Sequence, residues 1–210
     1  MEPKVYPLEE AIKQVKKASK ERFDASVEAH FRLGIDPSKS DQQVRGSVAL
    51  PHGTGKTIRV AVFTTKTEEA RKAGADLVGE KELVDKILKS GKCDFDIALA
   101  TPDMMKDLAK AGKVLGPRGL MPNPKDGTVT QDIAKAVAEL KKGKAAFRTD
   151  AYGIIHQIIG KVSFDNKKLA ANFKTLYEAI IKAKPKGVKG EYIKNITIAS
   201  TMGPGIRVKI

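Results

Sequence analysis

The sequence predicts a mixed fold, α/β and α+β, arranged in two domains. Strands with one apolar and one polar side occur near both ends of the chain, whereas the middle contains short apolar runs separated by helical segments. The first pattern is typical of a sheet with one solvated face, and the second of a parallel sheet covered on both faces. We therefore expect a split α+β domain at residues 1–56 and 144–210, and an inserted α/β domain at residues 57–143.

The two end segments combine amphipathic helices with half-solvated strands. Apolar residues at helical spacing predict one helix near the N-terminus and a second one, capped by Asp165, with a stripe of large apolar residues. Strict alternation of apolar and polar residues predicts the strands. The stripe consists of Leu169, Phe173, Leu176 and Ile180. We expect the helices at residues 7–20 and 165–184, and the strands at residues 25–33, 44–50, 145–148, 154–164, 192–200 and 206–210.

The middle segment alternates short buried strands with helices. Thr101-Pro102-Asp103 predicts a helix start, because it supplies an N-cap, a proline at the first helical position and an acid in the first turn. Thr130 is expected to cap a later helix that buries Ile133, Val137 and Leu140. We expect the strands at residues 58–63, 76–78 and 95–100, and two further helices at residues 67–73 and 81–88.

Residues 115–130, with the sequence LGPRGLMPNPKDGTVT, lie between the helix predicted to start at Thr101 and the helix predicted to start at Thr130. The segment holds three prolines and three glycines, too many for a helix or a strand. We expect an ordered loop, because the prolines fix φ and Asp126-Gly127 is a turn signal.

The composition favours a polyanionic partner and a place inside the cell. The 39 Lys and Arg residues exceed the 25 Asp and Glu residues, which gives a net charge of +14 and suggests nucleic acid or an acidic membrane surface. Cys93 is the only cysteine, so neither an internal disulfide nor a cysteine-based zinc site can form. The N-terminus lacks a signal peptide's apolar core, and no run approaches the roughly 20 apolar residues that span a bilayer. We expect a cytoplasmic protein without a membrane partner.

Residues 52–57, HGTGKT, resemble the end of a phosphate-binding loop, but the match fails. The motif requires a glycine where Leu50 stands, and it requires a helix where we predict a strand. We interpret the glycines as a hinge or as a tight crossing between domains. No GxGxxG follows a predicted strand, so we expect no nucleotide cofactor.

No catalytic or metal-binding constellation is visible, and we predict that the protein is not an enzyme. His30, His52 and His156 lie far apart without ligand spacing, so we expect surface or hydrogen-bonded histidines and no metal ion. Asp94 and Asp96 flank a strand start, where we interpret them as solubilising residues.

A polar surface beside glycine-containing turns remains as the candidate binding site. Glu28, His30 and Arg32 share the polar side of one predicted strand, and residues 200–205 form a corner whose glycines allow close approach of a ligand. Thr201 offers a hydroxyl and Met202 a polarizable contact, although an ordinary turn between strands is the alternative. Aromatic residues make up only 5% of the chain, so we expect structured RNA rather than base stacking along a single strand.

Several long segments resemble the family of the large-subunit ribosomal protein L-one, in its bacterial form. The resemblance covers nearly the whole chain in order. It implies a split α+β domain and an inserted Rossmann-like, three-layer α/β domain joined by a hinge, which coincides with the boundaries given above. The segments are residues 23–56, the loop at residues 115–130, GKVSF at residues 160–164 and STMGPG at residues 200–205.

The resemblance also implies partners and a site. It implies binding of a large-subunit rRNA stem-junction, a mobile stalk beside the exit site, release of deacylated tRNA, and repression of the protein's own operon through its mRNA. The chain would be a monomer when free and part of the ribosome when assembled. The implied RNA-binding residues are Arg22, Phe23, Ser26, Glu28, Asp150, His156, Ser163, Thr201, Met202 and Gly203. The implied hinge residues are His52, Gly53, Gly55 and Gly143.

The chain departs from the family pattern at two places. The chain lacks the further basic segment that family members carry before the first helix, and position 151 is Ala rather than a polar or basic residue. Both are expected to weaken the edge of the footprint. We also hypothesise that the loop at residues 115–130 rests near the hinge and helps to set domain opening. The alternatives are a nucleotide-dependent enzyme, which ATP, GTP or NAD would stabilise, and a non-specific basic coat, which would bind duplex DNA as well as rRNA.

Overall fold

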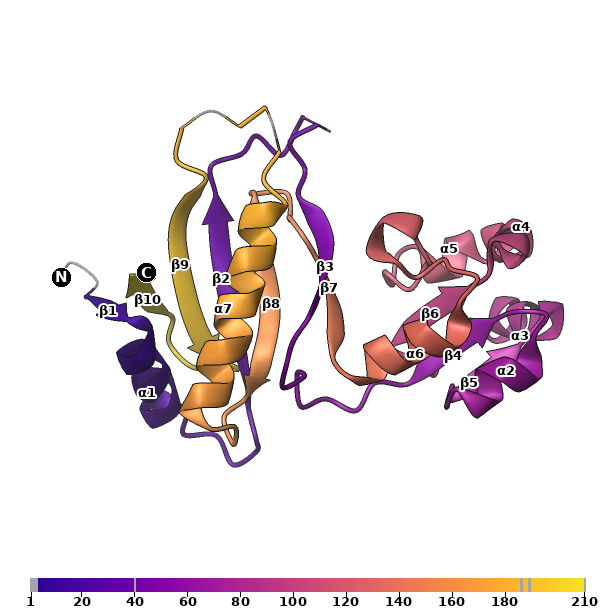
Figure 1. Ribbon diagram of the computed structural model, residues 1–210, viewed down its shortest axis with the longest axis horizontal. Helices are drawn as coiled ribbons and strands as arrows, with labels where there is room; N and C mark the ends of the chain where they lie inside the picture. Colours follow the sequence, from indigo (N-terminus) through magenta and orange to yellow (C-terminus); the bar gives the residue numbers. More distant parts are fainter. Residues whose placement is uncertain (1–3, 40, 186, 189, 210) are drawn as a thin grey trace. The chain divides into compact units, whose positions relative to one another are not determined.

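The computed structural model describes residues 4–39, 41–185, 187–188 and 190–209 (Figure 1). Its fold is mixed α/β with several sheets, so the predicted class is confirmed. The chain divides into two compact units, which are described here one at a time. Unit 1 comprises Met1–Gly55 and Gly143–Ile210, and unit 2 comprises Lys56–Lys142.

Unit 1 contains a five-stranded sheet in the order β1-β10-β9-β2-β8 and a separate pair, β3-β7. Strand β1 is parallel to β10, and the other neighbours are antiparallel. The strands are β1 (Val5–Pro7), β2 (Ser26–Leu33), β3 (Arg45–Ala49), β7 (Lys144–Arg148), β8 (Ile154–Lys161), β9 (Ile193–Ser200) and β10 (Ile206–Lys209). The helices are α1 (Leu8–Ala18) and α7 (Asn166–Lys182).

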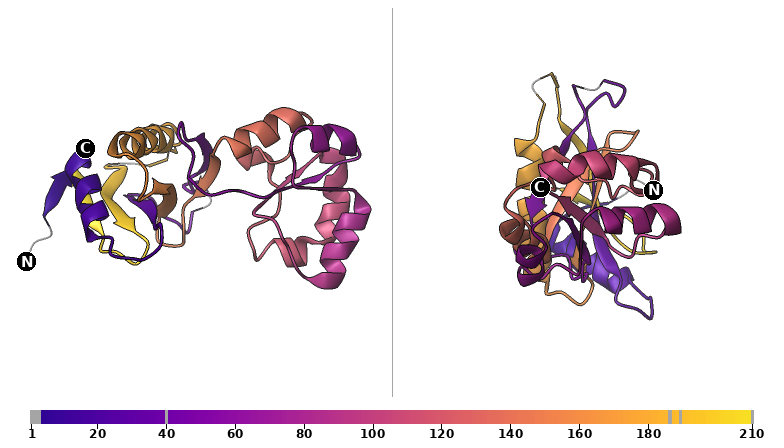
Figure 2. Two further views of the ribbon diagram at one scale, coloured as in Figure 1. Left: turned by 90° about the horizontal axis from the view of Figure 1, so that it is seen from below. Right: turned by 90° about the vertical axis from the view of Figure 1, so that its right-hand side faces the viewer.

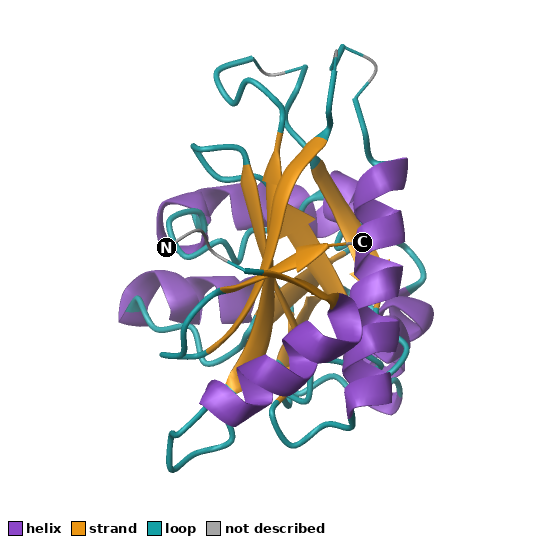
Figure 3. Cartoon of the chain, turned by 90° about the vertical axis from the view of Figure 1, so that its left-hand side faces the viewer, coloured by secondary structure: helices purple, strands orange, loops and turns teal. Residues whose placement is uncertain are grey.

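Both helices of unit 1 pack on the same face of the five-stranded sheet. The stripe predicted for α7 is confirmed, since Leu169, Phe173, Leu176 and Ile180 are all buried in one core with β2. The ring of Phe173 stacks on Phe31 of β2 with 5.6 Å between centroids. Figure 3 shows the strands in orange and the helices in purple. The other face of the sheet carries the polar residues of β2 and is called the open face below.

Unit 2 contains a parallel sheet in the order β5-β4-β6. All four residues of β4 are buried, because alternate side chains enter two separate cores: Ala61 and Phe63 face α3, α4 and α5, and Val60 and Val62 face α2 and α6. Figure 2 (left) shows helices on both sides of these strands, as the apolar runs predict. The strands are β4 (Val60–Phe63), β5 (Leu77–Gly79) and β6 (Ile97–Ala100). The helices are α2 (Thr67–Lys72), α3 (Lys81–Ser90), α4 (Met105–Lys110), α5 (Gly112–Leu115) and α6 (Ile133–Lys141), with 3-10 turns at Pro102–Met104 and Pro124–Asp126.

The loop at residues 115–130 is ordered, as its prolines predict. The amide of Asn123 donates to Oγ1 of Thr128 at 2.7 Å, and the amide of Thr128 donates back to the Asn123 carbonyl at 3.2 Å. Val129 then forms a parallel bridge with Ala100 at the end of β6. The loop therefore extends the sheet edge of unit 2, while its role in domain opening stays a prediction.

One of the expected helix caps is wrong, and two hold the expected position without a side-chain hydrogen bond. Thr101 occupies the N-cap position before Pro102, as predicted, but it begins the 3-10 turn that precedes α4, and its Oγ1 is buried without a partner among the described residues. Asp132, not Thr130, caps α6: its carboxylate accepts from the amide of Lys135, and Thr130 accepts only from the amide of Asp132. Asp165 occupies the N-cap position of α7, but its side chain forms no capping hydrogen bond.

Strand β1 was not predicted, because three residues are too few to show a period. The strand predicted at residues 154–164 ends at Lys161, where the chain turns toward α7. The last predicted strand reaches Lys209, and its expected final residue lies outside the described residues.

Candidate nucleic-acid interface

The open face of the sheet in unit 1 is built around β2, which pairs with β8 on one side and β9 on the other. Its residues alternate strictly between the buried core and the open face. Glu28, His30 and Arg32 therefore point away from the helices, with His156 and Thr197 flanking His30 on the neighbouring strands. This arrangement produces a broad polar surface on a rigid support.

Thr201 connects the end of β9 to the start of β2 through three hydrogen bonds with Ser26. The backbone amide of Thr201 donates to the Ser26 carbonyl at 2.9 Å. Oγ1 of Thr201 accepts from the Ser26 amide at 3.2 Å and lies 3.3 Å from the carbonyl to which it donates. The structure thus joins two predicted site residues that are far apart in the sequence.

Met202 and Gly203 form the turn that follows Thr201. Met202 has φ of 66°, the only positive φ of a described residue other than glycine, and 86% of it is exposed. A Cβ at Gly203 would lie 2.1 Å from Oγ of Ser200, so the Ser200 hydroxyl would have to move to admit a side chain there. The turn presents an apolar side chain to solvent in a conformation that costs about 1–2 kcal/mol for an L-residue.

Asp24 organises the other side of this corner and was missed in the sequence. Its carboxylate accepts from the amide of Ser163 at 3.1 Å and from the Ser163 hydroxyl at 2.8 Å, and its carbonyl accepts from Nζ of Lys161 at 3.1 Å. The preceding Phe23 is 56% exposed, and Arg22 is exposed beside it. An acid next to predicted contact residues was the signal that could have found Asp24.

Asp150 and His156 lie together at the opposite end of the open face. Nε2 of His156 is 3.4 Å from Oδ2 of Asp150, and Nδ1 of His156 is 2.8 Å from Nδ1 of His30. His30 and His156 are far apart in the sequence, but the register of β2 and β8 places them side by side. The expectation that they are hydrogen-bonded histidines is confirmed.

The environment of this group shifts two pKa values. Burial and the neighbouring His156 ring lower the pKa of His30 below its ordinary 6.5, although Glu28 acts in the other direction. Partial burial would raise the pKa of Asp150, but the amides of Ile154 and Tyr152 donate to its carboxylate and hold the pKa below 3.8.

The structure therefore divides the ten predicted site residues into two groups. Asp150 and His156 lie beside His30, whereas the start of β2 lies at the corner. Ser26 and His30 are four residues apart on β2, which corresponds to roughly 13 Å along an extended strand. The corner group comprises Arg22, Phe23, Ser26, Ser163, Thr201, Met202 and Gly203, with Glu28 between the two groups.

The four predicted hinge residues lie where the chain leaves and re-enters unit 1. A Cβ at Gly143 would lie 2.4 Å from Cα of Gly53, which makes this a tight crossing, and Gly55 also has a positive φ of 73°. The fully buried Asn172 of α7 accepts from the amide of His52 at 3.1 Å and donates to the Gly53 carbonyl at 2.8 Å. Asn172 was missed, although an amide on the apolar stripe of a helix was a visible signal.

Several charged residues of unit 2 form ion pairs within the unit. Lys56, the lysine of the phosphate-loop-like segment, pairs with Asp96 at 2.9 Å, and Asp96 also accepts from the amide of Arg59 at 3.0 Å. The solubilising role expected for Asp96 is therefore wrong. A strand follows Lys56, not a helix, as predicted. An open cleft between α2 and α3 is lined by Thr67, Arg71, Val78, Gly79, Glu80, Lys81, Glu82, Leu83 and Lys86.

Within the part of the chain that the structure describes, no three His, Cys, Asp or Glu side chains are grouped so as to hold a metal ion. Likewise, none of its helices combines the length and apolar character needed to cross a bilayer.

An open polar sheet face with a tightly built corner, on a chain of net charge +14, is typical of a nucleic-acid-binding protein. Residues 15–204 match the model of the ribosomal protein L1p/L10e family, and the chain belongs to this family. The predicted family resemblance is confirmed. Members of this family are structural proteins of the large ribosomal subunit that bind rRNA and are not enzymes, so this chain is an rRNA-binding ribosomal protein.

Proposed function

We propose that the open face and corner of unit 1 bind a stem-junction of large-subunit rRNA. In this proposal, residues 1–56 and 144–210 form the RNA-binding domain, and residues 57–143 form the inserted domain. The ten predicted residues, from Arg22 to Gly203, supply the contacts. The hydrogen-bonded pair of Ser26 and Thr201 is the observation that carries the proposal, because it fixes the exposed Met202 beside two backbone strands.

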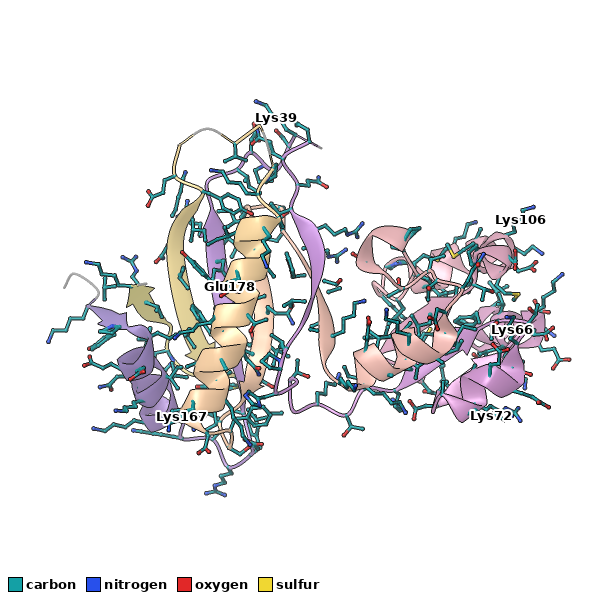
Figure 4. The ribbon with its side chains drawn as sticks, in the orientation of Figure 1. Lys39, Lys66, Lys72, Lys106, Lys167 and Glu178 are labelled. Carbon is teal, nitrogen blue, oxygen red and sulfur yellow. The ribbon has the colours of Figure 1, made fainter. Side chains whose placement is uncertain are left out.

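Specificity and affinity come from different residues in this proposal. Besides Arg22, the corner offers neutral hydrogen-bonding groups and two exposed apolar side chains, Phe23 and Met202, which suit the shape and 2′-hydroxyls of a folded RNA. Lysines on the surrounding surface supply attraction to phosphates, which depends on salt but not on sequence. Figure 4 labels two lysines of unit 1, Lys39 and Lys167, the second of them on α7, with their side chains extending outward.

The wider role that we propose follows from the family. The chain forms the mobile stalk beside the exit site, assists the release of deacylated tRNA, and represses its own operon by binding an mRNA element that mimics the rRNA site. It is a monomer when free and acts on the ribosome in the cytoplasm. The crossing at His52, Gly53, Gly55 and Gly143 serves as the hinge between the two domains.

The test compares wild type, Thr201→Ala and Thr201→Ser in filter binding to the rRNA stem-junction and to a scrambled RNA, across a salt series. Serine keeps the hydroxyl that bonds to Ser26, and alanine removes it. We expect alanine to lose about tenfold or more of the preference for the junction, serine to keep most of it, and all three proteins to share one salt slope.

Two outcomes would contradict the proposal. Equal binding of both RNAs by wild type would favour the non-specific coat, and duplex DNA then serves as the confirming competitor. Unchanged preference in Thr201→Ala would remove the corner from the site. Translation of a reporter that carries the operon's mRNA element, with the same three proteins, tests the repressor role separately.

A further inference from the structure

Two large apolar side chains stand out on the described surface of the protein. Met202 is 86% exposed and Tyr152 is 81% exposed, whereas the next of this kind, Phe23, is 56% exposed. Tyr152 is not among the site residues predicted from the sequence. A tyrosine ring that is almost wholly in water contributes little to the core and is available for contact with a partner.

The two side chains lie at opposite ends of the same open face. Met202 follows β9, whose last residue pairs with Val27, and Tyr152 precedes β8, whose first residue pairs with Arg32. Val27 and Arg32 are five residues apart on β2, which corresponds to roughly 17 Å. The open face is therefore bounded at each end by an exposed apolar group on a turn.

The turn that carries Tyr152 is held rigidly by Asp150. One carboxylate oxygen of Asp150 accepts from the amides of Tyr152 and Ile154, each at 2.8 Å, and the amide of Gly153 donates to the Asp150 carbonyl at 3.3 Å. Gly153 has φ of 74°, and a Cβ there would lie 3.1 Å from Ile35. Because the backbone is already fixed, a ligand that contacts the ring orders only the side chain.

The surroundings of Tyr152 are polar and charged. Arg32 is exposed on the open face opposite the first residue of β8, and Asp150 connects the turn to His156. Arg148 is exposed on the strand that leads into the turn. An isolated ring among charges does not match the apolar core of a protein interface, but it matches a nucleobase, which has an apolar face and a charged backbone.

We propose that Tyr152 stacks on an unpaired base of the rRNA bound to the open face. This inference rests on the proposed function, and it extends the footprint from the corner to the far end of the sheet. The low aromatic content excludes a row of stacking rings for a long single strand. A single ring is enough to stack on one unpaired base of a junction. The face of the base contacts the ring, while Arg32 lies near the phosphate of the same nucleotide. The contact therefore recognises that the nucleotide is unstacked and does not depend on which base it carries.

The test uses Tyr152→Ala, Tyr152→Phe and a matched control, Ile181→Ala, which truncates another exposed apolar side chain on α7. Filter binding to the rRNA stem-junction should show a loss of roughly 5- to 100-fold for alanine, within twofold of wild type for phenylalanine, and no change for the control. The salt slope should stay unchanged, because the ring carries no charge. In parallel, junction RNA with 5-iodouridine at its unpaired positions is irradiated, and the crosslinked residue is mapped by mass spectrometry.

A crosslink at Tyr152 together with the loss in Tyr152→Ala supports the inference. Wild-type affinity of the folded Tyr152→Ala protein, or a crosslink pattern without Tyr152, overturns it. If Thr201→Ala loses junction preference while Tyr152→Ala does not, the inference fails and the proposed function stands. If wild type itself shows no preference for the junction, both fail.

Discussion

The two units differ most in what covers their sheets. In unit 1, α1 and α7 bury one face of a mainly antiparallel sheet, and every second residue of β2 is left toward solvent. In unit 2, helices cover both faces of a parallel sheet, and β4 is buried throughout. Only the first arrangement leaves a sheet surface on which side chains from distant segments meet.

This difference explains why the candidate interface lies on unit 1. Ser26 and Thr201, Asp24 and Ser163, and the two histidines are paired across neighbouring strands or turns. In unit 2, by contrast, the carboxylate of Asp96 accepts hydrogen bonds from the Lys56 side chain and the Arg59 amide, which stabilise the unit itself. A sheet that is covered once is available for recognition, and a sheet that is covered twice serves as a rigid body.

The largest expected effect separates the two cores. Phe31→Ala in β2 and Phe63→Ala in β4 each remove a fully buried ring and should cost about 3–5 kcal/mol. We expect Phe31→Ala to weaken hydrogen-exchange protection in unit 1 and to abolish RNA binding, and Phe63→Ala to weaken protection in unit 2 alone. Hydrogen exchange resolved by segment, together with filter binding, measures both. Loss of RNA affinity in Phe63→Ala with unit 1 still protected would contradict the separation.

A smaller effect is expected at the start of α6. Asp132→Ala removes the cap that accepts from the amide of Lys135 and should cost about 1 kcal/mol of the stability of unit 2. Asp132→Ser is the matched control, because serine also caps helices and should keep most of this stability. Urea unfolding measures the change, and RNA affinity should stay constant. A change in affinity would indicate that α6 influences the open face.

At Met202, stability and binding should change in opposite directions. Met202→Gly relieves the left-handed backbone and should stabilise unit 1 by about 0.5–1 kcal/mol, while it removes the exposed side chain of the corner. Urea midpoints should rise slightly and junction affinity should fall. Met202→Ala provides the comparison, since it removes the side chain but keeps the strain. Equal affinity of wild type and both variants would exclude Met202 from the interface.

The smallest expected effect is a difference between the two units in how their stability depends on pH. The pKa of His30 is lowered below 6.5 by burial and by His156, so the neutral ring is favoured in the folded state. Its contribution is complete above about pH 6.5 and is lost as the pH falls from 6.5 through the lowered value. In unit 2, the Lys56 side chain lowers the pKa of Asp96 below 3.8, and the Val60 amide does the same for Asp76, so these carboxylates lose their contribution only below about pH 3.8.

Hydrogen exchange between pH 7 and pH 4 measures this difference. Unit 1 should lose protection gradually on acidification, and unit 2 should not. His30→Gln should remove the loss in unit 1. Identical pH profiles for wild type and His30→Gln would assign the acid sensitivity to other groups.

The order and type of the main elements could be predicted from the sequence because periodicity is a local property. The stripe of α7 and the buried run of β4 follow directly from the spacing of apolar residues. The three-residue β1 and the cap at Asp132 could not be predicted as reliably, since a short segment has no measurable period and several polar residues compete for one cap.

The site was predicted less completely, because its geometry depends on pairing between distant strands. The register that places His30 beside His156 is set by the sheet and not by either segment alone. Asp24 and Asn172 act through hydrogen bonds to partners more than a hundred positions away. The family resemblance predicted the contact residues, but it did not predict the side chains that hold them in place.

The split construction of unit 1 has a consequence for synthesis on the ribosome. Strand β2 is an interior strand of its sheet, yet its two neighbours begin at Ile154 and Ile193, so it emerges long before either of them. All of unit 2, from Lys56 to Lys142, is synthesised in between. The early strand therefore carries two unpaired edges throughout this interval. The inserted segment can complete its own core first, whereas the five-stranded sheet of unit 1 is complete only when the last strands have left the tunnel.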